Sequence, residues 1–175
     1  LFTYLVQATV PFHIAIADVG PNLAIAMIAA VSIALGRRYT FIMSLTIGYL
    51  LEIMMPVLDY INLLIYPVVC MLGALVFSDK SERKLEELRA QGKDTRQLHA
   101  HLRTPLCAMV SIMVFEFIHV IYIYLSGVDL DGGHMWRAFV DVAYTTLLAA
   151  LFQFPIRAWL GIYRQNRLNK EKNRQ

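Results

Sequence analysis

The chain has 175 residues, of which 58% are hydrophobic and only 17% are charged, and its formal net charge is +3. A single soluble core of this length cannot hide so much apolar surface, so the composition predicts an integral membrane protein. A charge of this size is typical of the excess of basic residues on the cytoplasmic side of a membrane protein, and binding to nucleic acid is therefore not expected.

Six apolar segments are separated by charges, prolines or glycines, and each is expected to form a transmembrane helix. They cover residues 1–17, 20–36, 40–56, 60–77, 105–126 and 136–160. At about 1.5 Å of rise per residue, these six helices use nearly the whole chain. The sequence thus predicts an all-α fold, with residues 1–175 forming one polytopic domain of six transmembrane helices in a lipid bilayer.

The basic residues indicate how these helices are oriented. When the spans are threaded alternately through a membrane, all Lys and Arg residues except Arg137 fall on one side. The positive-inside rule assigns that side to the cytoplasm. We therefore expect a multi-pass protein of the cell membrane with both termini in the cytoplasm.

The second span carries a stripe of small residues. Ala26, Ala30 and Ala34 recur every four residues, which places them on one face of a helix. Small side chains allow a neighbouring helix to approach closely in lipid, where helices associate mainly through packing contacts. The stripe is expected to be a helix-packing surface.

The third span repeats this spacing and ends it with a charge. Ser44, Gly48 and Glu52 also lie four residues apart, so close helix packing would hold the carboxylate of Glu52 at a fixed depth near the outer membrane interface. There it could reach water, cap the N-terminal amides of a neighbouring helix, or bind a basic side chain of a partner. The sequence leaves these three roles open.

The polar segment at residues 78–104 separates the fourth span from the fifth. Leu85 and Leu88 lie at helical spacing among charged residues, and Gly92 is a stop signal. This pattern predicts an amphipathic cytoplasmic helix, a break, and a second short helix that leads to Pro105. Two interpretations remain, a solvated extension of the fourth span and a docking surface for a cytoplasmic partner. The basic tail at residues 161–175 is also expected in the cytoplasm, where it could contact anionic lipid.

Ionisable residues within the spans are candidates for function by default. Glu116 and His119 are three residues apart in the fifth span, so they can share a hydrogen bond on one helix face. We interpret them as an intramembrane polar pair, with a proton relay as the alternative. The other intramembrane polar positions are His13, Asp141 and Arg157.

Other kinds of chemistry find little support in the sequence. A single Glu-x-x-His motif is only half of a di-iron site, which needs a second such motif and further carboxylates. Cys70 and Cys107 lie in apolar spans without clustered histidines, a pattern that favours neither a zinc site nor a disulfide. We expect no metal, no cofactor and no enzymatic activity.

Several of these positions resemble the MreD family of rod shape-determining proteins. The resemblance rests on Gly20-Pro21-Asn22-Leu23, Gly36, the set Ser44, Gly48 and Glu52, then Tyr66 and Gly73, and finally Phe154-Pro155 before a basic C-terminus. It covers nearly the whole chain, including its length and six spans. The family usually has Asp where Asn22 and Glu52 stand, and a shorter, less charged segment in place of residues 78–104.

The resemblance implies a non-enzymatic component of the bacterial cell-elongation machinery in the inner membrane. Such a protein associates with the bitopic protein MreC and, through it, with MreB filaments and with the glycosyltransferase and transpeptidase that synthesise peptidoglycan. Its expected partner-binding residues are Pro21, Asn22, Ser44, Gly48 and Glu52, while Gly73 is expected to serve helix packing.

The resemblance also implies a fold similar to the substrate-binding subunits of energy-coupling-factor vitamin transporters. That similarity provides the alternative function, a subunit that holds a vitamin in a pocket open to the outside. The residues expected to line this pocket are Asn22, Glu52, Asn62, Glu116, His134 and Asp141.

Overall fold

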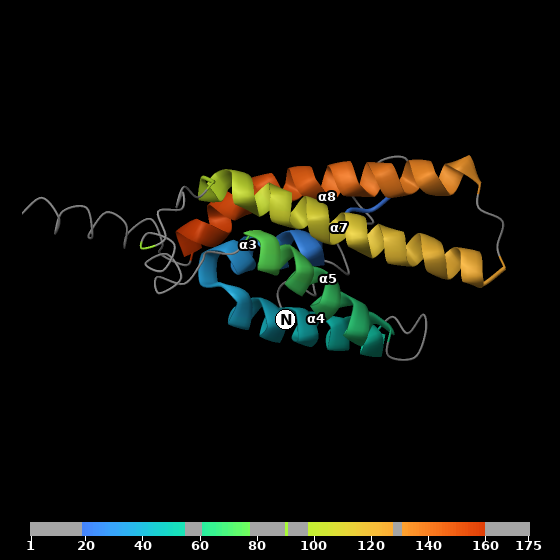
Figure 1. Cartoon of the computed structure of the whole chain (residues 1–175), viewed down its shortest axis with the longest axis horizontal. Helices are drawn as coiled ribbons and strands as arrows, with labels where there is room; N and C mark the ends of the chain where they lie inside the picture. Colours follow the sequence, from blue (N-terminus) through green and yellow to red (C-terminus); the bar gives the residue numbers. More distant parts are fainter. Residues whose placement is uncertain (1–18, 55–60, 78–89, 91–97, 128–130, 160–175) are drawn as a thin grey trace, which may run out of the picture.

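The computed structural model describes residues 19–54, 61–77, 90, 98–127 and 131–159, and the elements in these ranges are helical (Figure 1). They are α3 (Leu23–Leu35), α4 (Arg37–Met54), α5 (Ile61–Phe77), α7 (Ala100–Leu125) and α8 (Gly132–Trp159). The all-α expectation is confirmed for this part of the chain. The first expected span with His13, most of the segment at 78–104, and the tail at 161–175 lie outside the described residues.

The five helices correspond to the second through sixth expected spans, with one clear correction. The sequence placed the start of the fifth span at Pro105, whereas α7 begins at Ala100. The carbonyl of His99 accepts hydrogen bonds from the amides of Leu102 (2.9 Å) and Arg103 (3.1 Å), which fixes this earlier start. Residues 100–104, where the sequence predicts a second short helix leading to Pro105, are therefore helical but continuous with α7.

Helix α3 lies at the centre of the bundle. It packs against each of the other four helices, which contact one another in the order α4, α5, α7, α8 (Figure 1). Leu23, Ile25 and Ile28, which point in different directions around α3, are all fully buried. A helix that is apolar on every side must be covered by other helices or by lipid, and the four other described helices cover α3.

The outer helices present large apolar side chains to the surroundings. Leu64 of α5, Phe117 of α7 and Leu147 of α8 are each more than half exposed. By length and composition, α7 and α8 are the described helices able to cross a membrane, while α3 and α5 are shorter apolar helices. Apolar surface on this scale marks a membrane or protein contact rather than a surface in water, and the two long helices suggest a membrane protein.

Two arginines stabilise the C-terminal end of α5. Arg37, at the start of α4, donates from Nη2 to the carbonyl of Leu75 at 3.3 Å. Arg103, near the start of α7, donates from Nη1 to the carbonyl of Phe77 at 3.5 Å. The last carbonyls of a helix lack partners within it and carry partial negative charge, so these cations hold three helix ends together.

Candidate functional site

A polar junction joins the N-terminus of α3 to α8. The backbone amide of Asn22 donates to Oγ1 of Thr145 at 2.9 Å and to Oδ1 of Asp141 at 3.3 Å. The hydroxyl of Thr145 in turn donates to the same oxygen of Asp141 at 2.8 Å. Because the first amides of a helix have no intrahelical acceptor, α8 supplies one from outside.

The side chain of Asn22 extends this junction to α5. Its Oδ1 accepts from the amide of Ile25 at 3.1 Å, which caps α3, and its Nδ2 donates to the hydroxyl of Tyr66 at 3.1 Å. Asn22 is only 7% exposed, and its neighbour Pro21 is buried as well. These two expected partner-binding residues are therefore engaged within the bundle.

A pair of carboxyl groups lies beside this junction. The side chain of Glu116 on α7 is hydrogen-bonded to that of Asp141 on α8. An ionised carboxylate has no hydrogen to donate, so this bond requires one proton shared by the pair. The sequence analysis paired Glu116 with His119. It named Asp141 as an intramembrane polar position and, with Glu116, as a candidate pocket residue, but it did not predict their bond, because the two acids are 25 residues apart on different helices.

The acid pair opens into a cavity of about 410 Å³ between α7 and α8. This volume lies within the range of small-molecule sites. Its lining comes from the segment before α3 and from both long helices: Val19, Gly20, Glu116, His119, Val120, Ile123, His134, Arg137, Ala138 and Asp141.

Acidic and basic groups lie at different depths of this cavity. Asp141 is 9% exposed and Glu116 is half-buried, whereas Arg137 is exposed one turn earlier on α8. His119 is also exposed, and its ring lies edge-on to Phe115 with the centroids 6.2 Å apart. Acids therefore form the inner part of the cavity, and basic groups lie toward its mouth.

The six residues expected to line a vitamin pocket separate into two groups. Glu116, His134 and Asp141 line the cavity, and Asn22 is bonded to Asp141 behind it. Glu52 and Asn62 are instead bonded to each other where α4 leads to α5, with Oε2 of Glu52 accepting from the amide of Asn62 at 2.9 Å. The structure thus brings four of the six together.

The sequence left three roles open for Glu52. The hydrogen bond from the amide of Asn62 corresponds to one of them, the capping of a neighbouring helix. Asn62 is the second residue of α5, so its amide is one of those without an intrahelical acceptor. The rest of the Glu52 face packs closely on α5, because a Cβ on Gly48 would lie 2.7 Å from the carbonyl oxygen of Asn62. Ser44 is fully buried, and its hydroxyl donates to the carbonyl of Phe41 at 3.0 Å.

The small residues of the other spans also lie at helix contacts. Ala26 and Ala30 are buried in α3, and Ala34 is half-buried. Gly73 of α5 faces α7, where an added Cβ would meet the hydroxyl of Ser111 and lie 3.0 Å from the carbonyl oxygen of Cys107. The backbones of α5 and α7 therefore approach closely at Gly73.

The remaining polar candidates fall elsewhere in the bundle. Arg157 is 8% exposed in the last turn of α8, far along that helix from the cavity. Cys70 and Cys107 are buried free thiols. Within the ranges that the structure describes, no three His, Cys, Asp or Glu side chains are arranged to hold a metal ion.

Comparison of the chain with family models, with curated proteins and with solved structures gave no match in any of the three. Functional assignment therefore depends on the chain's own residues: an all-helical bundle with an apolar outer surface, a polar junction at the start of α3, and a cavity that contains a carboxyl pair.

Proposed function

We propose that this chain is a non-enzymatic, multi-pass component of the bacterial cell-elongation machinery, with an MreD-like role. Its direct partner is a bitopic protein of the MreC type, which connects it to MreB filaments and to the enzymes of peptidoglycan synthesis. In this proposal the chain crosses the inner membrane six times with both termini in the cytoplasm.

The observation that carries the proposal is that the MreD-like positions meet as helix contacts. Asn22 bonds to Tyr66 across α3 and α5. Glu52 caps α5, and Gly73 lies against α7. These residues are far apart in the sequence, yet each lies at a contact between helices. This supports the interpretation that they belong to one family-specific fold.

The described helix ends support the proposed orientation. Arg37 and Arg103 both bond to the C-terminal carbonyls of α5, so the start of α4, the end of α5 and the start of α7 lie at one end of the bundle. The connection between α7 and α8, which carries Asp131, lies at the other end (Figure 1). Basic residues thus lie at one end of the bundle and an acidic residue at the other. The positive-inside rule places the basic end in the cytoplasm.

Burial constrains where a partner makes contact. Pro21, Asn22, Ser44 and Gly48 are buried in the bundle, and only Glu52 of the five expected partner-binding residues is partly exposed. We therefore infer that the buried four act by shaping the bundle, and that the partner helix contacts the outward apolar side chains of the outer helices. Association of helices in lipid depends on such close packing.

Co-purification tests the proposal. The tagged chain is solubilised in mild detergent from a rod-shaped bacterium, with an unrelated tagged multi-pass protein as the control for nonspecific capture. Recovery of a bitopic cell-elongation protein with this chain alone is the expected result. Recovery of an ATPase module without any bitopic partner would contradict it.

A second candidate function is favoured by the cavity. A substrate-binding subunit of a vitamin transporter needs a pocket among its helices, and Glu116, His134 and Asp141 line one of about 410 Å³. The ATPase module is the partner expected in that case, so the same experiment separates the two functions.

A further inference from the structure

We propose that the cavity between α7 and α8 binds the phosphoethanolamine headgroup of a membrane phospholipid. The ammonium group of the lipid lies against Glu116 and Asp141, and its phosphate lies against Arg137. This site requires the membrane location of α7 and α8, and it does not depend on the protein partner proposed above.

The inner part of the cavity suits a primary ammonium group. Glu116 and Asp141 are hydrogen-bonded to each other, so at most one of the two carboxyl groups is ionised while that bond is made, and Oδ1 of Asp141 already accepts from Asn22 and Thr145. A charge held away from bulk water is costly unless an opposite charge and hydrogen bonds compensate it. An ammonium group carries one positive charge and three N–H donors, so it supplies both.

The mouth of the cavity suits a phosphate. Arg137 precedes Asp141 by four residues on α8, which places it about 6 Å nearer the N-terminal start of the helix. A guanidinium group binds phosphate oxygens through two parallel hydrogen bonds. The two-carbon linker of ethanolamine separates ammonium from phosphate by a similar distance, so one headgroup can reach both ends of the site.

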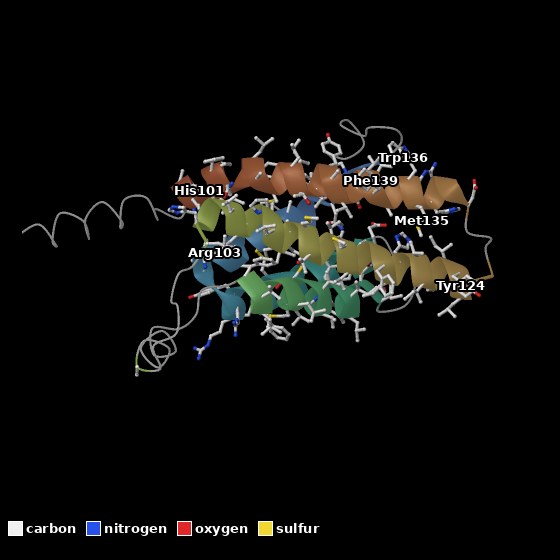
Figure 2. All side chains as sticks on the ribbon, turned by 45° about the horizontal axis from the view of Figure 1, so that its top comes forward. His101, Arg103, Tyr124, Met135, Trp136 and Phe139 are labelled. Carbon is white, nitrogen blue, oxygen red and sulfur yellow. The ribbon has the colours of Figure 1, made fainter. Side chains whose placement is uncertain are left out.

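The surrounding surface puts this mouth at the level of lipid headgroups. Trp136 and Phe139 are exposed beside Arg137, with ring centroids 5.9 Å apart, and Figure 2 shows them on the outer side of α8 near its start. Of these two rings, the indole of Trp136 carries a polar N–H, and tryptophan is enriched at the membrane interface. Helix α8 is also longer, at 28 residues, than the roughly 20 that cross the hydrocarbon core, so it has enough length for its ends to extend beyond that core.

The lining predicts which lipids are selected. Choline carries a quaternary ammonium group, which cannot donate hydrogen bonds to carboxyl groups and is usually held by aromatic rings. Apart from two imidazoles, the lining residues are aliphatic or charged. The headgroup of phosphatidylglycerol carries no positive charge that could pair with Glu116 and Asp141. We therefore expect phosphatidylethanolamine to bind at least about tenfold more tightly than phosphatidylcholine or phosphatidylglycerol.

Native mass spectrometry of the purified protein, titrated with these three lipids of identical acyl chains, tests the selectivity. Glu116→Lys places a tethered ammonium group in the site and should abolish the preference. Glu116→Gln preserves the shape and should weaken the preference several-fold. Arg137→Gln should lower affinity about threefold, while the matched control Arg38→Gln, an exposed arginine of α4, should behave like the parent.

Thermal unfolding in detergent establishes that each variant is folded. Equal binding of the three lipids by the folded parent, or a preference that survives Glu116→Lys, would overturn the proposal.

Soluble phosphoethanolamine that binds as tightly as the lipid would overturn the lipid as the source of the headgroup. An unselective parent whose Glu116→Lys variant loses a co-purifying protein would show that the cavity holds that protein's basic side chain instead. The lipid-binding outcomes do not bear on the co-purification test of the parent chain.

Discussion

Glu52 illustrates how this bundle uses a charge in largely apolar surroundings. Its carboxylate accepts a hydrogen bond from the amide of Asn62 in the first turn of α5. The N-terminus of a helix carries partial positive charge, so both the hydrogen bond and the charge are favourable there. One side chain thereby fixes the direction in which α5 leaves the connection after α4.

Substitutions at Glu52 should separate these two contributions. Glu52→Ala removes the acceptor and should lower the free energy of unfolding by about 1 kcal/mol. Glu52→Gln keeps an acceptor and loses only the charge, which should cost about 0.5 kcal/mol. Thermal unfolding of the purified variants measures both, and two equal losses would contradict the capping role. A partner pull-down with folded Glu52→Gln, compared with the parent, tests whether the charge also serves partner binding.

Gly36 is the single residue between α3 and α4. Its φ of +87° and ψ of −178° fall in a region that only glycine adopts readily. Nothing lies within 4 Å of the position that a Cβ would occupy, so the constraint is the backbone conformation itself rather than space. A side chain at Gly36 therefore strains the turn that directs α4 back along α3.

We predict that Gly36→Ala lowers the free energy of unfolding by about 1–3 kcal/mol. The matched control is Gly133→Ala in the first turn of α8, where φ is not positive and the nearest atom to a Cβ is 3.7 Å away. That control should be neutral or slightly stabilising, because alanine favours a helix. Equal melting temperatures for the two variants would contradict the role of the turn.

At the level of elements, α5 is closely packed against a neighbouring helix on each of two sides. Gly48 of α4 meets the start of α5 on one side, and Gly73 of α5 meets α7 on the other. Backbones that approach this closely gain dispersion contacts along their whole length. Even one methyl group at either glycine must therefore move a helix.

Gly73→Ala should separate α5 from α7 and cost about 1–3 kcal/mol, as overpacking does. Its Cβ would overlap the hydroxyl of Ser111, so Ser111→Ala in the same protein should restore part of the loss. The rescue should be incomplete, because the carbonyl oxygen of Cys107 lies 3.0 Å from the same position and cannot be removed. Additive losses in a double-mutant cycle of thermal unfolding would contradict this contact.

At the scale of the whole molecule, orientation in the membrane is the decisive prediction. The native cysteines are 2% and 1% exposed, so they should react little with a maleimide that cannot cross membranes. On intact cells, Gly133→Cys at an exposed position in the first turn of α8, at the end of the bundle expected outside the cell, should be labelled. Ala90→Cys, at an exposed position of the expected cytoplasmic segment, should be labelled only after the cells are opened. Labelling of Ala90→Cys on intact cells would reverse the topology and remove the basis of the proposed function.

The sequence by itself determined where the described helices lie. The starts and ends of α3, α5 and α8 fall within a few residues of the expected spans, because a continuous apolar run bounded by polar or glycine residues is a local property. The start of α7 was misplaced by the proline rule. Pro105 is the sixth residue of α7, and the turn before it is held by the amides of Leu102 and Arg103, which donate to the carbonyl of His99 and do not need the missing N–H of the proline.

Only the tertiary structure decided which polar groups pair. The sequence could assign Glu116 a partner on its own helix, but its bond to Asp141 depends on how α7 and α8 are rotated about their axes. The bond between Glu52 and Asn62 likewise depends on how α5 begins against α4. Apolar patterning fixes the length of a helix in lipid but constrains its rotation weakly when the helix is apolar on all sides. Close packing at small residues and bonding of the buried polar groups select one arrangement of the bundle.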